Sequence, residues 1–290
     1  MGESNYLQEK ALGKVNLTFR VLGKETKNYH SINSIITFLP DLYDNIFIKK
    51  NKKLIIKTYG EFSKTLSENG GDTLVTKAIH LIKKKYKIPN NFQIKIEKNI
   101  PLGAGLGGGS ADAAAVTRLI FKMYNLKINK KEIISHLSVL GADIPACYFS
   151  SNQRVEGFGN KLTKLKLLKK NIWILLIKPN VNLSTREIFE GFSKPFSTIP
   201  KYNYNYKNLI NDINCNKNDL QAAAENNSQV FKNLINCLPI TEEMMSVPKM
   251  TGSGSTIFIL FKKKFNALNY MANIENITKG YWKKISKVIL

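Results

Sequence analysis

The chain has 290 residues, 43% of them apolar and 22% charged, which is typical of a soluble globular protein with one large or two smaller domains. No run of about 18 apolar residues occurs, and the first ten residues lack the apolar stretch of a secretory signal, so we expect a cytoplasmic protein without a membrane partner. The cysteines and histidines are scattered, which argues against a disulfide framework and a zinc site.

The formal net charge of +23 permits two interpretations. A strongly basic chain is typical of nucleic-acid-binding proteins. Of its 44 basic residues, however, only four are arginine, the residue best suited to bidentate phosphate and guanine recognition. Lysine, asparagine and isoleucine are frequent throughout, so biased composition explains the charge. We expect no nucleic-acid partner, and a nucleic-acid-binding protein stays the alternative from a different class.

In the first part of the chain, apolar residues recur in some segments at every second position and in others at the spacing of a helix. Period-two alternation predicts strands, and apolar residues at helical spacing predict helices. In chain order we expect strands at 14–22 and 31–39, a pair of strands at 45–49 and 53–57, a helix at 72–87, a strand at 91–97, a helix starting at Ser110 and a short helix at 130–140.

After residue 160 the pattern changes, so we place domains at 1–160 and 161–290. Here we expect strands at 172–177 and 256–261, helices at 184–192 and 219–236, and a polar surface connection at 201–218. Strands first and alternation afterwards favour an α+β fold over a doubly wound sheet.

One segment carries a chemical signal: a predicted strand is followed by five glycines within seven residues and then by a helix. Glycine lets the backbone approach an anion closely, and the first N–H groups of a helix favour negative charge. The segment therefore predicts a phosphate site, and a tight turn without a ligand is the weaker interpretation. Its residues are Pro101, Leu102, Gly103, Ala104, Gly105, Leu106, Gly107, Gly108, Gly109 and Ser110.

Two familiar phosphate motifs do not fit this segment. Gly103, Gly105 and Gly108 match G-x-G-x-x-G, but no acidic residue stands in 121–131, where a dinucleotide site requires one. A Walker A loop needs lysine after the last glycine, whereas Gly109 is followed directly by Ser110.

Residues 101–115, Pro-Leu-Gly-Ala-Gly-Leu-Gly-Gly-Gly-Ser-Ala-Asp-Ala-Ala-Ala, resemble the signature of the GHMP kinases. Residues 11–17 and 249–258 are similar to the N-terminal and C-terminal motifs of that family, and the three motifs occur in the family's order. The resemblance implies an α+β, two-domain GHMP kinase fold. Its N-terminal domain would be ribosomal-protein-like with a left-handed crossover, and its C-terminal domain an α/β sandwich, with ATP and Mg²⁺ bound between them.

Five segments are similar to the branch of that family that phosphorylates 4-diphosphocytidyl-2-C-methyl-D-erythritol. They are Lys14-Val-Asn-Leu, Asn28-Tyr-His, Gly141-Ala-Asp-Ile-Pro, the stretch at 179–189 and Asn218-Asp-Leu. The resemblance implies a small-molecule substrate, a cytidyl-diphosphate sugar alcohol, and a monomer or homodimer. Asn28 replaces a family glycine and Thr73 a family asparagine. Another GHMP kinase, of the homoserine or mevalonate type, is the nearest alternative.

The resemblance also implies roles for individual residues. Asp143 would be the general base, with Lys14 holding it ionised and stabilising the attacking oxygen. The glycine segment, 101–110, would bind ATP, with the Ser110 hydroxyl reaching the metal. The residues implied for the substrate are Asn16, Tyr29, His30, Thr185, Phe189, Gly252 and Gly254.

Overall fold

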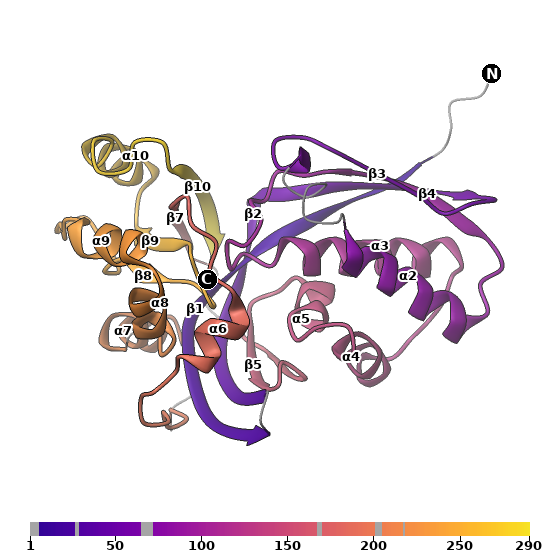
Figure 1. Ribbon diagram of the computed structural model, residues 1–290, viewed down its shortest axis with the longest axis horizontal. Coiled ribbons are helices and arrows are strands. Elements are labelled where there is room, and N and C mark those ends of the chain that lie inside the picture. Colours follow the sequence, from indigo (N-terminus) through magenta and orange to yellow (C-terminus); the bar gives the residue numbers. More distant parts are fainter. Residues whose placement is uncertain (1–5, 27–28, 65–71, 167–169, 201–204, 217) are drawn as a thin grey trace. The chain divides into compact units, whose positions relative to one another are not determined.

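The computed structural model describes residues 6–26, 29–64, 72–166, 170–200, 205–216 and 218–290 (Figure 1). Contacts divide the chain into two compact units, and several segments alternate between them. Unit 1 comprises residues 1–13, 42–102 and 107–150, and unit 2 comprises 14–41, 103–106 and 151–290. The last crossing, at Ser150–Ser151, lies near the predicted boundary at residue 160, which stays a prediction. No helix in the described ranges has the length and apolarity to cross a membrane.

Within the described ranges the first sheet has the order β3-β4-β2-β5-β6, with β1 paired to β2. Strands β1 and β2 are long enough to contribute to both units. The predicted pairing of 45–49 with 53–57 is wrong, because β4 lies between them, antiparallel to β2 and parallel to β3. The bounds are β1 Leu7–Thr26, β2 Tyr29–Asn51, β3 Ile55–Tyr59, β4 Asn91–Glu97, β5 Gln153–Gly157 and β6 Lys161–Lys164.

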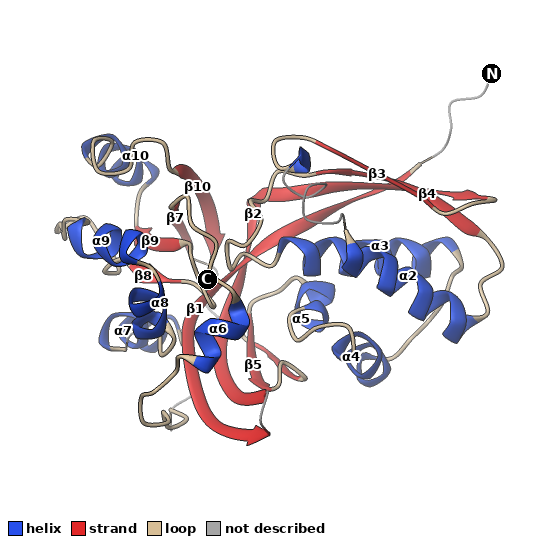
Figure 2. Ribbon diagram, in the orientation of Figure 1, coloured by secondary structure: helices blue, strands red, loops and turns tan. Residues whose placement is uncertain are grey.

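Unit 1 packs helices against one face of the β3–β4 part of this sheet (Figure 2). Helix α2 buries a single stripe at helical spacing, Val75, Ala78, Ile79 and Ile82. Asp72 begins it by accepting a hydrogen bond from the Val75 N–H at 3.0 Å, as the sequence predicted for 72–87. The helices of unit 1 are α2 Thr73–Tyr86, α3 Gly108–Met123, α4 Lys130–Ser138 and α5 Ile144–Phe149.

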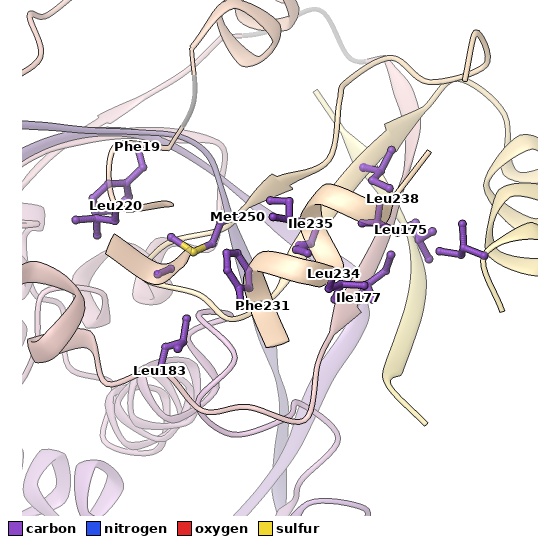
Figure 3. Close-up of a cluster of buried hydrophobic side chains, with 14 of the residues drawn as sticks. Phe19, Leu175, Ile177, Leu183, Leu220, Phe231, Leu234, Ile235, Leu238 and Met250 are labelled. Atoms are coloured by element: carbon purple, nitrogen blue, oxygen red, sulfur yellow. The ribbon is translucent and has the colours of Figure 1, made fainter. Parts of the chain in front are cut away.

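Unit 2 contains the second sheet, in the order β10-β7-β9-β8. Strands β7 and β9 are almost wholly apolar, and their side chains pack with those of the helices into one core (Figure 3). The bounds are β7 Asn171–Lys178, β8 Lys249–Met250, β9 Ile257–Phe261 and β10 Trp282–Ile289, with helices α6 Thr185–Glu190, α7 Tyr206–Cys215, α8 Gln221–Asn227, α9 Gln229–Cys237 and α10 Lys264–Asn273.

Two predictions in this unit are wrong. The polar stretch at 201–218 contains helix α7, because Leu209 and Ile213 are buried and the buried Asp212 pairs with Arg20 of β1. The helix expected over 219–236 is two helices, because Ser228 interrupts the first and caps the second through Phe231 N–H. The α+β class is confirmed by two mainly antiparallel sheets in the described residues.

Candidate active site

The glycine segment links strand β4 to helix α3. The helix begins at Gly108 rather than at Ser110, which corrects the sequence prediction. Gly107 makes the earlier start possible, because it precedes the helix with φ 70°, a left-handed conformation that side chains disfavour. The first N–H groups of a helix have no partner within it, and its dipole adds positive potential there. This end of α3 is therefore suited to an anion such as phosphate.

The central part of the segment, residues 103–106, packs inside unit 2 against the second glycine motif. A Cβ atom at Gly105 would lie 2.7 Å from the carbonyl oxygen of Thr251 and 2.8 Å from that of Gly254. Backbone hydrogen bonds add Thr256 N to Ala104 O at 3.4 Å and Lys14 N to Leu106 O at 2.9 Å. Only glycine permits this approach, so the two motifs that the sequence singled out meet in space.

Lys14 and Asn16 lie beside the same motif, at alternate positions of β1, and both are buried. The buried Lys14 ammonium donates to Asn16 Oδ1 at 2.5 Å, and the Asn16 backbone N–H donates to Thr251 Oγ1 at 2.8 Å. A Cβ atom at Gly252 would lie 3.3 Å from Lys14 Nζ and 3.1 Å from Asn16 Oδ1. The Lys14 ammonium, the Asn16 amide and the two glycine-rich turns therefore lie close together in unit 2.

Two residues of this arrangement were not among the predicted site residues. Thr251 is fully buried and its hydroxyl accepts from Asn16. The Asn218 amide donates to the carbonyl oxygens of Met250 and Gly252, at 3.0 and 2.7 Å, and so fixes the entry to the second glycine motif. The sequence signal for Asn218 was its Asn-Asp-Leu element. Thr251 is the residue directly before Gly252, but nothing in its type announced a contact with β1.

Asp143 lies in unit 1, at the N-cap position of helix α5, a helix that the sequence did not predict. An aspartate before proline commonly caps a helix. Here the side chain makes no capping hydrogen bond to α5, while Ile144 and Pro145 beside it are buried. The capping role that would have explained Asp143 without function is therefore absent.

The predicted nucleobase residues gather in unit 2. His30 stacks on Phe189 with ring centroids 5.2 Å apart, and Phe192 meets His30 edge-on at 6.2 Å. His30 Nδ1 is buried with no hydrogen-bond partner among the described residues. Burial and, secondarily, the charge of Lys24 lower the pKa of His30, which favours the neutral ring. A neutral imidazole with an unsatisfied nitrogen is suited to the edge of a base.

Two further residues were predicted to bind the substrate, Thr185 and Tyr29, and the structure describes the side chain of Thr185 only. Thr185 begins helix α6, and its hydroxyl bonds Ser253 Oγ at 2.8 Å, so it adjoins the second glycine motif. The backbone of Tyr29 begins strand β2, but its side chain lies outside the described residues. Phe189 also packs on the core of unit 2, so its burial has a structural contribution as well.

The donor set for a metal is sparse. Among the described residues no cluster of three or more His, Cys, Asp or Glu side chains is placed to hold an ion. Mg²⁺ commonly takes one or two protein ligands and completes its shell with water and substrate phosphates. The half-buried Ser110, on the first turn of α3, fits that minimal role.

Comparison with known proteins adds evidence on the family. Residues 73–151 match the family model described as GHMP kinases N terminal domain. A 4-diphosphocytidyl-2-C-methyl-D-erythritol kinase of Clostridium beijerinckii is 35% identical over 268 residues, covering 89% of this chain and 92% of the relative. The kinase of the same name from Clostridioides difficile is 34% identical over 274 residues, covering 91% and 90%.

Solved structures support the fold. A crystal structure of 4-(cytidine 5'-diphospho)-2C-methyl-D-erythritol kinase has a TM-score of 0.76 at 21% identity, covering 98% of this chain and 100% of the solved chain. A homoserine kinase from Cytophaga hutchinsonii has a TM-score of 0.69 at 15% identity, covering 100% and 96%. At these identities the likeness establishes a shared fold and does not distinguish one substrate from another.

Proposed function

The chain belongs to the 4-diphosphocytidyl-2-C-methyl-D-erythritol kinase family, and we propose that it transfers the γ-phosphoryl group of ATP to the 2-hydroxyl of that compound. The observation that carries the proposal is the meeting of three sequence-distant motifs in unit 2. Lys14 and Asn16, Gly105, and Thr251 with Gly252 approach within contact distance. Glycine-lined backbone next to a lysine is well suited to binding phosphate groups.

The glycine segment is the proposed binding element for the phosphates of ATP. Gly107, in the left-handed conformation, turns the chain into α3 and leaves its first N–H groups available for phosphate oxygens. Ser110 is the proposed protein ligand of Mg²⁺. The bound ion would neutralise charge on the phosphates during transfer.

Asp143 is the proposed general base. A carboxylate next to buried apolar residues can accept the proton of the substrate hydroxyl as the phosphoryl group leaves ATP. Lys14 is proposed to serve the same step by stabilising negative charge on the attacking oxygen. Phosphoryl transfer needs little covalent chemistry from the protein, so placing one base, one cation and the phosphate-binding backbone is the main requirement.

The cytidine part of the substrate is assigned to His30, Phe189 and Tyr29. Phe189 offers an aromatic face, and the unsatisfied His30 Nδ1 offers a hydrogen bond to the base edge. Because His30 and Phe189 already stack on each other, we propose that the base packs against this pair rather than between its rings. Thr185, Asn16, Gly252 and Gly254 are assigned to the remainder of the substrate.

A coupled assay of ADP release tests the proposal. The purified chain is supplied with ATP and with one acceptor at a time: 4-diphosphocytidyl-2-C-methyl-D-erythritol, homoserine or mevalonate. We expect turnover with the cytidyl compound only, and its loss when a chelator removes Mg²⁺. Turnover with homoserine or mevalonate instead would assign the chain to another GHMP kinase activity. ATP binding without turnover of any acceptor would contradict the substrate alone.

A further inference from the structure

A buried ion cluster in unit 1 lies at both ends of the glycine segment. The Lys98 ammonium donates to Asp44 Oδ2 at 2.5 Å and to Asp112 Oδ2. The lysine side chain is 1% exposed and both carboxylates are fully buried. Lys98 stands just before Pro101, where the segment begins, and Asp112 opens the second turn of α3, the helix that follows the segment.

Asp44 fixes the chain that enters the segment. Its Oδ1 accepts from the backbone N–H groups of Asn99 and Ile100, at 2.6 and 2.8 Å. The Lys98 backbone is held in addition by its N–H bond to Tyr59 O at 2.7 Å. The Asp44 carboxylate on β2 therefore binds the Lys98 side chain and also the backbone that leads into the glycine segment.

The helix that leaves the segment rests on the same group. A Cβ atom at Gly108 would lie 3.1 Å from Ile100 Cγ2 and 3.8 Å from Asp44 Oδ2, so α3 begins directly over the end of the incoming chain. Lys98 then joins Asp112, in the second turn of α3, to Asp44. Both ends of the segment are thus connected to Asp44 on β2.

The stability of the fold does not by itself explain why this buried ion cluster is present. Removing charges from water often costs as much as their mutual attraction returns, so buried ion pairs are weak sources of net stability. In some proteins such pairs fix one arrangement of the groups they join, and that is our hypothesis for this cluster. Phosphate binding by backbone N–H groups depends on such an arrangement, because small displacements of positioning groups can cost about a hundredfold in rate.

We propose that Lys98, bridging Asp44 and Asp112, is a positioning residue that holds the two ends of the glycine segment at the separation required for ATP binding. The proposal rests on the function proposed above, in which this segment binds ATP phosphates. It assigns no contact with ATP to the Lys98 side chain.

Asp112 offers a matched pair of variants. Asp112→Ala removes the connection to Lys98, whereas Asp112→Asn keeps an oxygen that can accept from it. Asp112 Oδ1 and Asp72 Oδ2 are buried without a hydrogen-bond partner among the described residues, and the two carboxyl groups are close enough for each to affect the pKa of the other. The new amide group of the Asn variant can donate to Asp72, so this variant should fold normally.

Leu119→Ala controls for lost stability. Leu119 lies further along α3 and is 1% exposed, so its truncation destabilises the same helix without touching the cluster. Each variant is measured for melting temperature, for the Kd of ATP without acceptor, and for the KM of both substrates. Asp112→Ser provides a second truncation, whose short polar side chain cannot reach Lys98, should the Ala variant fail to fold.

We expect Asp112→Ala or Asp112→Ser to raise the Kd of ATP by roughly ten- to a hundredfold, with the KM of the acceptor little changed. Asp112→Asn should stay within about threefold of the unsubstituted enzyme, less than half a decade on the affinity scale. Unchanged ATP affinity in both truncations would overturn the proposal. So would an equal loss in Leu119→Ala at the same melting temperature. Failure of the unsubstituted chain to bind ATP would refute the proposed function instead.

Discussion

Asp143 can be tested with the smallest change at the residue scale, the replacement of one carboxylate oxygen by an amide nitrogen. Asp143→Asn should fold and bind ATP normally but lose at least about a hundredfold in kcat, because an amide cannot accept the hydroxyl proton. The side chain makes no capping hydrogen bond to α5, so the amide removes no helix cap. ATP affinity, melting temperature and kcat are measured on the same preparation. Turnover near the unsubstituted rate would remove Asp143 from the mechanism.

Phe189 is both a proposed substrate contact and part of the unit 2 core, so its two roles must be separated. Stacking on a base contributes roughly 1–3 kcal/mol, so loss of the ring should raise the KM of the cytidyl substrate by about one to two decades. Phe189→Leu retains apolar volume for the core, and Phe189→Ala does not. We expect both to raise this KM, leaving that of ATP unchanged, with only the Ala variant losing much stability.

The contrary result for Phe189 is equally clear. A lower melting temperature with normal kinetics of the folded variants would make the residue structural. Equal increases in both KM values would show that the change spreads beyond a base-stacking contact.

At the element scale, the turn from the glycine segment into α3 depends on Gly107. Gly107→Val should weaken ATP binding by at least about tenfold, since a β-branched residue resists the left-handed conformation that aims the first N–H groups of α3. Gly280 is the matched control: its φ is 77°, against 70° for Gly107, and no atom lies within 4 Å of a Cβ built there. Gly280→Val should show similar backbone strain with unchanged ATP affinity.

Thermal unfolding and ATP titration of the two glycine variants give the comparison. If both lose the same stability and neither loses affinity, the turn at Gly107 is structural only.

Elements with one strong local pattern were predictable, and those defined by distant partners were not. Helix α2 has an apolar stripe and an Asp72 cap, both readable in sequence. The sequence around helix α7 looked like a polar surface loop, because nothing near Asp212 in the chain indicates that it is buried. Its ion-pair partner, Arg20, lies on a strand far away in the sequence. The pairing of β2 with β4 likewise depends on a competition between strands. For the site, glycine density revealed the two turns, but the Thr251 contact with Asn16 needed the fold.

At the scale of the whole molecule, the two units share strands, and this bears on which parts of the chain can fold alone. Unit 2 takes residues 14–41 from the N-terminal part of the chain. Phe19 and Val21 belong to its core cluster, and residues 32–36 of β2 pair with β5. A cut at the predicted boundary near residue 160 would therefore separate a core from some of its own members.

We predict that residues 161–290 do not fold as an isolated fragment. The fragment would lose Arg20, the ion-pair partner of the buried Asp212, and breaking such a buried pair costs about 3–5 kcal/mol. It would also lose two hydrogen bonds between Asp219 and β1: the Val21 N–H donates to Asp219 Oδ2 at 2.7 Å, and the Asp219 N–H donates to Phe19 O at 3.0 Å. Whole domains have only about 5–15 kcal/mol of stability, so these losses together with the missing Phe19 and Val21 should be decisive. Circular dichroism should show no cooperative thermal transition for the fragment, and co-expression with residues 1–160 should restore one. A fragment that melts cooperatively on its own, with near-ultraviolet signals of packed aromatic side chains, would show that the boundary at residue 160 separates two independent domains.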